Sequence, residues 1–480
     1  MKKILRAVFI VCFALPLVHL NLTLYAQETT VNPTRLYIQL EEELANRLEN
    51  LSKKDITLTQ EAKLDQLNQL FGVSIIRRVF PSAGKYEYAH RSHQLHQWYE
   101  VVFQDTVRQD IQQLIQAYKQ INSVQWAEPV YEMSLEVTKL PEATMNDPRF
   151  KDQWHYENTG QSGGTKGADI KLTSAWSVET GDSEVVVAII DGGMDINHED
   201  LQGGMWVNTQ EQQGKPGVDD DNNGYIDDIH GYGFGDQRGD FFPHYHGIHV
   251  GGTVGATNNN GKGVSGIAGG TDADAGVRLM SCAVFGSRGQ GGFPESFIYA
   301  ADNGAVIAQN SWSGGLPSKV LEDAIDYFVK RAGYDNTTEN YDKNIQIGPM
   351  AGGLVVFSAG NNRSSNPRYP SSYESCFAVA STDHHDKKSD FSNYGDWVEI
   401  SAPGSSVLST YTNNSYNYLS GTSMAAPHVS GVAALLVSHF GKEGFKPDQV
   451  KTLLLSSADN IDEQNPTYVG QLGGWSTKCF

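Results

Sequence analysis

The stretch Val185-Val186-Val187-Ala188-Ile189-Ile190-Asp191 decides the fold. Its six apolar residues are too few for a helix and fit a strand that is buried on both faces of a sheet. Similar apolar runs end at Ala308 and at Phe357, and stretches with helical spacing separate the runs. This alternation predicts an α/β fold with a parallel central sheet between two layers of helices.

Polar residues come directly or shortly after each of these strands. Asp191 follows the first, Asn310-Ser311 follows the second, and Ser358-Ala359-Gly360-Asn361 follows the third. Ligands of open parallel sheets bind outside the carboxyl ends of the strands. These residues are therefore the first candidates for a site.

A serine precedes a helical pattern in Gly421-Thr422-Ser423-Met424-Ala425-Ala426-Pro427-His428-Val429. We expect Pro427 in the first turn of that helix, where its missing N–H costs no hydrogen bond. Ser423 then lies at the positive end of the helix dipole, which favours an oxyanion. Taken alone, the pattern also fits a serine that only caps the helix.

A histidine begins a second helix in His246-Gly247-Ile248-His249-Val250, where it can act as a general base, a metal ligand or a plain polar residue. Asp191 needs a partner because it ends a buried strand. Both demands are met if Asp191 fixes the tautomer of His246 and His246 takes the proton of Ser423. The chain order Asp, His, Ser differs from that of chymotrypsin-like proteases and α/β-hydrolases.

The segments around Asp191, His246 and Ser423 resemble the three signatures of subtilisin-like serine proteases. The resemblance implies a three-layer subtilisin-like fold with seven parallel strands. It also implies an endopeptidase that hydrolyses peptide bonds in proteins through an acyl-enzyme intermediate. By the same resemblance, Asn361 and the backbone N–H of Ser423 form the oxyanion hole. The alternative for Asn361 is an asparagine in a turn after a strand.

The resemblance further implies a binding region in which an extended peptide adds as a strand, which predicts broad specificity. The implied residues are Ser311, Trp312 and Ser313 on one side of the primary pocket, Ser358, Ala359 and Gly360 on the other, and Gly289 and Gly291 in the edge segment. Trp312 fits a core aromatic residue equally well.

Two positions near the expected triad depart from the family pattern. Ile248 stands where the family usually has Thr, and Gly192 stands where a hydroxyl residue usually follows the catalytic Asp. Without these hydroxyls the triad lacks orienting hydrogen bonds, which we expect to slow the enzyme rather than silence it. Residues 475–480 also depart from the family pattern, and we interpret this tail as altered or truncated.

An acidic segment predicts a calcium site. Asp219-Asp220-Asp221-Asn222-Asn223-Gly224-Tyr225-Ile226-Asp227-Asp228 places oxygen donors at alternate positions before a glycine. The expected ligands are Asp219, Asp221, Asn223 and Asp227, and a solvated acidic turn is the alternative. The resemblance alone implies a second calcium site at Asp147, Asp200 and Asn259. Zinc bound by His244, His246 and His249 is a weaker alternative, because no carboxylate or thiolate at ligand spacing completes such a site.

Residues 27–145 predict a separate small α+β unit. Strand-like stretches at 36–40 and 99–103 alternate with helical patterns at 61–71 and 106–121, and a polar linker follows at 136–146. The unit resembles the ferredoxin-like prosegments that block a subtilisin-like cleft until they are cut away. We therefore predict a self-processed zymogen with its catalytic domain at 146–480. The alternative function is a calcium-stabilised binding protein on the same scaffold that has lost turnover.

The N-terminus and the composition predict a secreted protein. Basic residues precede an apolar stretch at 7–18, and Ala26 ends a cleavage site, which together indicate a signal peptide at 1–26. We expect the protein in the periplasm, at the cell surface or in the medium, as a monomer without a membrane span in its mature form. The net charge of −20 argues against nucleic acid as a partner. After the leader three cysteines remain, so no complete disulfide framework is expected, and Cys282 is predicted to be a buried strand thiol.

Overall fold

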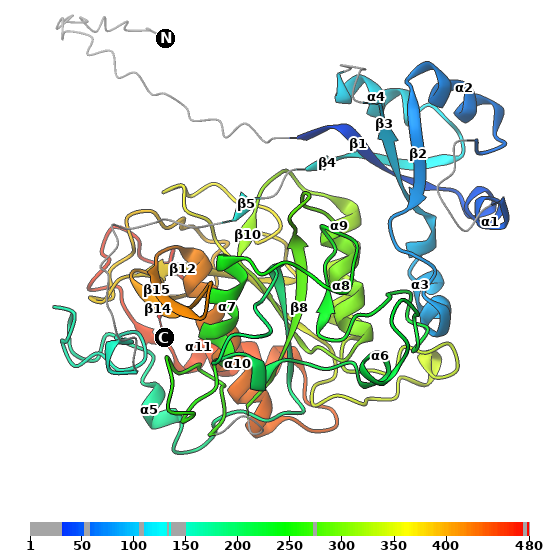
Figure 1. Cartoon of the computed structure of the whole chain (residues 1–480). Coiled ribbons are helices and arrows are strands. Elements are labelled where there is room, and N and C mark those ends of the chain that lie inside the picture. The colour runs from blue at the N-terminus through cyan, green and yellow to red at the C-terminus, as the bar shows by residue number, and fades with distance from the viewer. Residues whose placement is uncertain are drawn as a thin grey trace, which may run out of the picture.

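The computed structural model describes residues 31–51, 58–104, 110–131, 134–135, 150–271, 276–473 and 478–479. These residues form a small N-terminal domain and a larger domain beside it (Figure 1). The predicted signal peptide and the predicted linker at 136–146 lie outside the described residues.

The N-terminal domain is built on an antiparallel sheet whose four described strands have the order β2-β3-β1-β4. Its strands are β1 (Val31–Leu40), β2 (Val73–Arg78), β3 (Trp98–Phe103) and β4 (Val124–Tyr131). Its helices are α1 (Glu42–Leu51), α2 (Ala62–Leu70), α3 (Glu87–Ser92) and α4 (Ile111–Tyr118). Helices connect β1 to β2 and β3 to β4 in this strand order, which is the ferredoxin-like arrangement that the sequence predicts.

The larger domain contains a sheet whose nine described strands have the order β16-β17-β13-β12-β11-β9-β6-β8-β7. The seven strands from β13 to β7 pair in parallel, as the sequence predicts. They are β6 (Val186–Gly192), β7 (Gly231–Tyr232), β8 (Arg278–Phe285), β9 (Ile307–Asn310), β11 (Leu354–Ser358), β12 (Cys376–Thr382) and β13 (Ile400–Pro403). The short strands β16 (Asp459–Asn460) and β17 (Lys478–Cys479) extend one edge. Every residue of β6 is buried, because helices cover both faces of the sheet.

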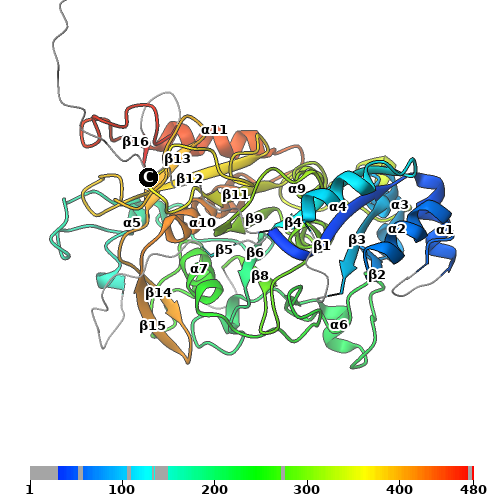
Figure 2. The ribbon, with the colours of Figure 1, turned by 90° about the horizontal axis from the view of Figure 1, so that it is seen from above.

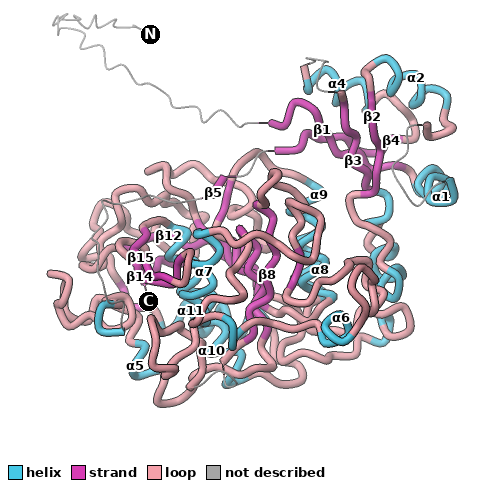
Figure 3. The backbone as a smooth tube through the Cα atoms, viewed as in Figure 1, coloured by secondary structure: helices cyan, strands magenta, loops and turns pink. Residues whose placement is uncertain are grey.

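Helices cover the two faces in separate layers, and Figure 3 shows the strands running between them. One face packs against α7 (Tyr245–Gly255), α10 (Thr422–Phe440) and α11 (Pro447–Ser457). The other face packs against α8 (Phe293–Asp302) and α9 (Lys319–Arg331). The remaining elements are short helices α5 (Leu172–Ala175) and α6 (Thr209–Gln213) and the strands β5 (Ser134–Leu135), β10 (Trp312–Ser313), β14 (Val407–Tyr411) and β15 (Ser415–Leu419).

The view from above shows the N-terminal domain next to α9 (Figure 2). Cys282 and Cys376 are buried free thiols in β8 and β12, and the prediction for Cys282 is confirmed. None of the helices in the described part of the chain has the length and apolar character needed to cross a membrane.

Candidate active site

Asp191 and His246 form a buried hydrogen-bonded pair at the carboxyl edge of the sheet. Asp191 lies near the end of β6 and His246 in the first turn of α7. The Nδ1 atom of His246 is 2.7 Å from Oδ1 of Asp191, which also accepts a hydrogen bond of 2.6 Å from the backbone N–H of Gly192. Nε2 of His246 hydrogen-bonds to no described residue. With Nδ1 engaged by the carboxylate, Nε2 is the nitrogen that can take up a proton.

Ser423 lies in the first turn of α10 and is linked to Ser311 by two hydrogen bonds. Its Oγ donates to the carbonyl of Ser311 at 3.0 Å, and Oγ of Ser311 donates to the carbonyl of Ser423 at 2.8 Å. The helix begins at Thr422, so Pro427 lies in the second turn, and its predicted place in the first turn is wrong. Pro427 has no N–H to donate to the carbonyl four residues earlier. The hydroxyl of Ser311 satisfies that carbonyl instead.

Asn361 is held against the start of the same helix. Its Oδ1 accepts hydrogen bonds from the backbone N–H of Thr422 at 2.9 Å and from Oγ1 of Thr422 at 3.0 Å. A flipped amide would point its NH₂ group at the Thr422 N–H, so these bonds set the orientation of the amide. The NH₂ group consequently lies at the end of the amide away from Thr422.

His244 explains why glycine stands at position 192, which is one of the two departures from the family pattern. Its Nδ1 caps α7 by accepting from the backbone N–H of His246 at 3.3 Å. A Cβ at Gly192 would lie 2.6 Å from Cβ of His244, so His244 fills the space of a side chain at 192. Burial lowers the pKa of His244 despite the nearby charge of Asp191.

Ile248, the other departure, is a fully buried core residue of α7. One carboxylate oxygen of Asp191, Oδ2, is buried and hydrogen-bonds to no described residue. That the lost hydroxyls at positions 192 and 248 slow the enzyme stays a prediction.

The N-terminal unit supplies a strand to the predicted substrate-binding segment. In the antiparallel pair of β5 and β10, Leu135 lies opposite Trp312 and Ser134 opposite Ser313. The sequence predicts that a peptide adds as a strand at the segment with Gly289 and Gly291, whereas β5 pairs with β10, which belongs to the predicted primary pocket. The side chain of Trp312 points into the core, where its Nε1 donates to the carbonyl of Ile190 at 2.8 Å. Trp312 is thus a core aromatic residue whose backbone belongs to the binding edge.

The other predicted binding residues lie close to these elements. Ser358 and Ala359 are buried at the end of β11, and the N–H of Gly360 donates to Oγ1 of Thr422 at 3.0 Å, next to Ser423. The predicted edge segment turns back onto the end of β8, because the N–H of Gly291 donates to the carbonyl of Val284 at 2.9 Å and the carbonyl of Gly289 accepts from Gly286 at 2.7 Å.

Comparison with known proteins agrees with this geometry. The model of the subtilase family matches residues 182–475. The chain belongs to the subtilase family. The model of the N-terminal domain of that family matches residues 36–160.

Similar proteins include the thermophilic serine proteinase of Bacillus sp. (strain AK1), which is 33% identical over 65% of this chain and 66% of the relative. Thermitase of Thermoactinomyces vulgaris is 32% identical over 66% of this chain and 92% of the relative. The extracellular basic protease of Dichelobacter nodosus is 32% identical, and the match covers 54% of its length. These matches support a hydrolase of the serine endopeptidase type. The solved structure of fervidolysin from Fervidobacterium pennivorans shares the fold, with a TM-score of 0.60 and 20% identity over 94% of this chain and 60% of that chain.

The N-terminal domain of this subtilase contacts the larger domain through a helix cap. The carboxylate of Glu128 in β4 accepts from Oγ of Ser318 at 2.5 Å and from the backbone N–H of Lys319 at 2.9 Å. These groups begin α9, whose positive end favours a carboxylate. Burial raises the pKa of Glu128.

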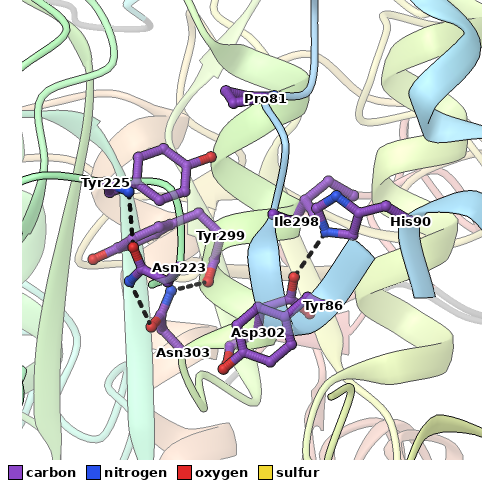
Figure 4. A pocket seen from close by; sticks show the side chains of 10 residues that line it. Pro81, Tyr86, His90, Asn223, Tyr225, Ile298, Tyr299, Asp302 and Asn303 are labelled. Atoms are coloured by element: carbon purple, nitrogen blue, oxygen red, sulfur yellow. Dashed lines mark hydrogen bonds and ion pairs between the residues drawn. The ribbon is translucent and has the colours of Figure 1, made fainter. Parts of the chain in front are cut away.

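Apolar and ring contacts complete this interface. The core beneath α8 and α9 includes four side chains of the N-terminal domain, namely Phe80, Ala89, Leu95 and Trp98. Figure 4 shows a small pocket between the two domains, where Nε2 of His90 lies 2.9 Å from the carboxylate of Asp302 at the end of α8. The N-terminal domain is thus docked on the side of the sheet that α8 and α9 cover, opposite to α7 and α10.

The subtilase contains an acidic cluster that fits a hard cation. Carboxylate oxygens of Glu211, Asp221 and Asp228 lie within 4.8 Å of one another. Burial and, to a smaller extent, the charges of Asp221 and Glu211 raise the pKa of Asp228 to about 7. The ammonium group of Lys85 in the N-terminal domain lies 3.4 Å from Asp221. A bound cation would relieve the repulsion among these acids, and hard divalent cations prefer such oxygen ligands.

The cluster shares only Asp221 with the four ligands predicted from the sequence. Asp219 accepts from the backbone of Asn223 at 3.0 Å, and Asp227 accepts from the N–H of Gly217 at 2.9 Å, so both hold the turn together. Asn223 donates from Nδ2 to Asp228 at 3.1 Å. Sequence reasoning missed Glu211, because it lies in a separate helix before the acidic segment, and Asp228, because it falls outside the alternate spacing.

The second predicted calcium site is described only in part. Asp200 is buried and accepts from Nδ2 of Asn260 at 2.7 Å and from the N–H of Val264 at 2.9 Å. Asn259 is exposed, and the structure brings Asn260 to Asp200 in its place. Asp147 lies outside the described residues.

Proposed function

We propose that this subtilase is a secreted serine endopeptidase with Asp191, His246 and Ser423 as its triad, made as a precursor that processes itself. The observation that carries the proposal is the 2.7 Å contact between buried Asp191 and His246 at the edge where α10 presents Ser423. Relatives that include an extracellular protease support the secreted location.

In the reaction, Oγ of Ser423 attacks the carbonyl carbon of the scissile peptide bond. Its proton passes to Nε2 of His246, and Asp191 stabilises the imidazolium that forms. Ser423 must therefore exchange its hydrogen bond with the Ser311 carbonyl for one with His246 when substrate binds, since catalytic hydrogen bonds often tighten only in the complex. His246 then protonates the leaving amine, and a water molecule hydrolyses the acyl-enzyme by the same steps in reverse.

The oxyanion of each tetrahedral intermediate receives hydrogen bonds from the side-chain amide of Asn361 and the backbone N–H of Ser423. The two bonds from Thr422 hold the Asn361 amide before substrate arrives. A donor that is already oriented needs no reorganisation during the reaction, which makes it effective.

The N-terminal domain acts as an intramolecular inhibitor in this proposal. Its strand β5 pairs with β10, the edge on which a peptide substrate would add, and Glu128 anchors it on α9. Substrate therefore cannot pair with β10 until β5 leaves. Cleavage after β5 would cut the connection to the catalytic domain.

Calcium is the proposed structural ion, held by Glu211, Asp221 and Asp228. When bound, it would supply positive charge that offsets the repulsion of these acids and stabilises the loop around them.

The test uses Ser423→Ala, expressed in a host without other proteases. We expect it to remain an uncut precursor that a fluorophosphonate probe does not label, whereas wild type shortens and is labelled. Ser438→Ala is the matched control, because the same change is made on the same helix away from the site. Cleavage of Ser423→Ala within residues 133–146 would contradict self-processing.

A binding protein without turnover is the second candidate, favoured by the buried Oδ2 of Asp191, which hydrogen-bonds to no residue in the described part of the chain. Absence of probe labelling in the folded wild-type protein would select that candidate.

A further inference from the structure

We infer that Arg363 and Lys388 bind an acidic side chain of the substrate on the far side of the scissile bond from the primary pocket. The inference rests on the proposed peptidase function and adds a second determinant of substrate choice. It narrows the broad specificity that strand addition alone predicts, because one position after the cut would favour glutamate or aspartate.

A cavity of about 340 Å³ lies beside the loop that follows β11. Its lining consists of two cationic, one acidic and two aromatic side chains, namely Arg363, Lys388, Asp390, Tyr394 and Tyr468. Two positive charges thus face one carboxylate, although the whole chain has a net charge of −20. A cavity with this balance of charge repels metal ions and other cations and attracts anions.

Lys388 provides a positive charge that is held in place in the wall of this cavity. Its Nζ donates to the carbonyls of Ser389 at 2.9 Å and of Ser392 at 3.1 Å. The same ammonium lies 5.0 Å from the centre of the ring of Tyr468 and 5.5 Å from that of Tyr394. Backbone carbonyls and aromatic rings orient an ammonium without carrying a full negative charge. These contacts therefore fix the position of the charge and leave it able to attract an anion.

The chemistry of the two cations selects a carboxylate. Burial lowers the pKa of Lys388 to about 8, with Asp390 acting in the opposite direction and Arg363 in the same direction. Arg363 is exposed, always protonated and able to present paired donors to a carboxylate. A glutamate or aspartate side chain would supply negative charge to both cations, a glutamine would not, and a lysine would be repelled.

Backbone hydrogen bonds fix the cavity beside the proposed oxyanion hole. Arg363 is two residues after Asn361, and two residues of chain span about 7 Å at most. The N–H of Arg363 donates to the carbonyl of Phe391 at 3.0 Å, and the N–H of Tyr394 donates to the carbonyl of Ser364 at 3.1 Å. The segment that contains Lys388 is thereby tied to the loop that contains Asn361. A substrate held at the oxyanion hole would have the cavity within reach of its next few residues.

The order of the strands puts the cavity on the side of the leaving group. β11 lies between β9 and β12 in the sheet. The primary pocket uses β10, which follows β9, and Arg368 contacts that side by donating to Oγ of Ser313 at 2.7 Å. Lys388 and Tyr394 come after β12 and before β13, on the opposite side of β11. A peptide bound at β10 before the cut would continue toward the cavity after it, advancing about 3.3 Å with each residue.

The test measures kcat/KM of the processed wild-type enzyme on peptides of one sequence that is cut at a single bond. Every peptide ends in an amide, so that only a side chain can supply a carboxylate, and one of the four positions after the cut holds Glu, Gln or Lys. At one of these positions we expect Glu to exceed Gln by about tenfold, because only Glu forms charged hydrogen bonds with the cavity. The other positions should give Glu/Gln ratios near 1.

Reversal of one charge in the cavity should reverse the preference. Arg363→Glu changes an exposed residue, so the fold should tolerate it. The cavity would then hold two acids and one cation. At the selective position, the Glu/Gln ratio should fall below 1, and the Lys peptide should become a better substrate than the Gln peptide. Lys442→Glu makes the same change of charge at an exposed site beyond the other end of α10 and should keep the wild-type ratio.

Three outcomes would overturn the inference and leave the peptidase standing. The first is a wild-type Glu/Gln ratio near 1 at all four positions with good cleavage of the Gln peptides, and this result needs no variant to fold. The second is an unchanged ratio in Arg363→Glu. The third is an equal loss of preference in Lys442→Glu, which would assign the effect to the charge of the whole protein. If no peptide is cut and the fluorophosphonate probe labels nothing, the proposed function itself fails.

Discussion

Ser423 is positioned by a neighbouring serine as well as by its own helix. Pro427 deprives the Ser423 carbonyl of the usual helical hydrogen bond, and the hydroxyl of Ser311 replaces it at 2.8 Å. Ser423, the proposed nucleophile, is thereby tied to the segment between β9 and β10, on which substrate is proposed to add. In the proposed mechanism, a shift of that segment on substrate binding would move Ser423 with it.

Replacing Asn361 by leucine keeps a similar volume and removes the amide donor. We expect kcat to fall by about 10²–10³, the range known for an oxyanion-hole donor in subtilisin, with little change in KM. Steady-state kinetics of the processed enzyme measure this effect. Asn366→Leu, on the exposed part of the following loop, is the control. A kcat within threefold of wild type would refute the role of Asn361.

Gly192 and His244 should behave as a coupled pair. Gly192→Ser places its Cβ 2.6 Å from Cβ of His244, so we expect it to lower both kcat/KM and thermal stability. His244→Ser is smaller and still caps α7, because serine is a favoured capping residue. The double variant should recover activity relative to Gly192→Ser, with a coupling energy of about 1 kcal/mol or more in a double-mutant cycle. Strictly additive effects would show that His244 does not determine the need for glycine at 192.

The sequence predicts a triad of Asp191, His246 and Ser423, but it gives no sign of the place of Arg368. Asp191, His246 and Ser423 each begin or end a regular element, so their places follow from strand and helix patterns. Arg368 lies in an irregular loop, and its approach to Ser313 and Gly360 depends on a turn that no periodic pattern reveals. Contacts made by loops between distant segments are the part of a site that one sequence leaves undetermined.

At the scale of elements, a buried histidine ties α7 to the hairpin of β14 and β15. Nε2 of His249 donates to the carbonyls of Val407 at 3.0 Å and Asn417 at 3.1 Å. Burial, with a smaller effect of His246, lowers the pKa of His249 to about 3. These contacts use the ring as a neutral donor between a helix and two strands. Among the described residues, His249 does not belong to a group of side chains close enough together to hold a metal ion.

The neutral state of His249 makes folding sensitive to acid. Its pKa is depressed in the folded protein and near 6.5 when unfolded, so the unfolded state binds more protons at low pH. The stabilisation is fully present above about pH 6.5 and is lost as pH falls toward 3, with a cost of about 2 kcal/mol at pH 5. In a Ser423→Ala background, His249→Gln should be less stable than its parent at pH 7.5 but lose less between pH 7.5 and 5. If thermal melts show that both proteins lose the same stability between pH 7.5 and 5, His249 is not the cause of the acid sensitivity.

The sequence predicts which segments form strands and helices more closely than it predicts where those strands and helices begin and end. Continuous apolar runs identify β6, β9 and β11 because a strand covered on both faces tolerates no polar alternation. The sequence places Pro427 wrongly in the first turn of α10, because proline is favoured there. In the structure Pro427 lies in the second turn, and the hydroxyl of Ser311 satisfies the carbonyl of Ser423 that the proline leaves without a donor. A tertiary hydrogen bond of that kind has no local signal in the sequence.

At the scale of the whole molecule, the N-terminal domain contacts three parts of the larger domain, namely the strand β10, the start of helix α9 and the acidic cluster. It pairs with β10, caps α9 through Glu128 and places Lys85 beside Asp221. Removal of the domain would expose the binding edge, uncap a helix and withdraw a positive charge from an acidic cluster in a chain of net charge −20. We therefore expect the processed enzyme to need a bound cation more than the precursor does.

Calcium should stabilise the folded protein through the cluster of Glu211, Asp221 and Asp228. An ion that binds only the folded state adds about 2.7 kcal/mol when its free concentration is a hundredfold above Kd. We expect EGTA to lower the Tm of Ser423→Ala, which cannot digest itself, by several degrees. Magnesium should not restore the Tm, because its small octahedral shell fits flexible oxygen cages poorly.

Variants of the acidic cluster test whether calcium acts at this site. Asp221→Asn should abolish the response to EGTA, whereas Asp240→Asn changes an exposed acid by the same charge and should leave the response intact. Lys85→Met removes the neighbouring ammonium, so the uncut precursor should then bind calcium more tightly and lose more Tm in EGTA. Coincident melts with and without EGTA in the parent would refute the calcium proposal. The triad would be unaffected by that result, since Asp191 and His246 hold each other without any ion.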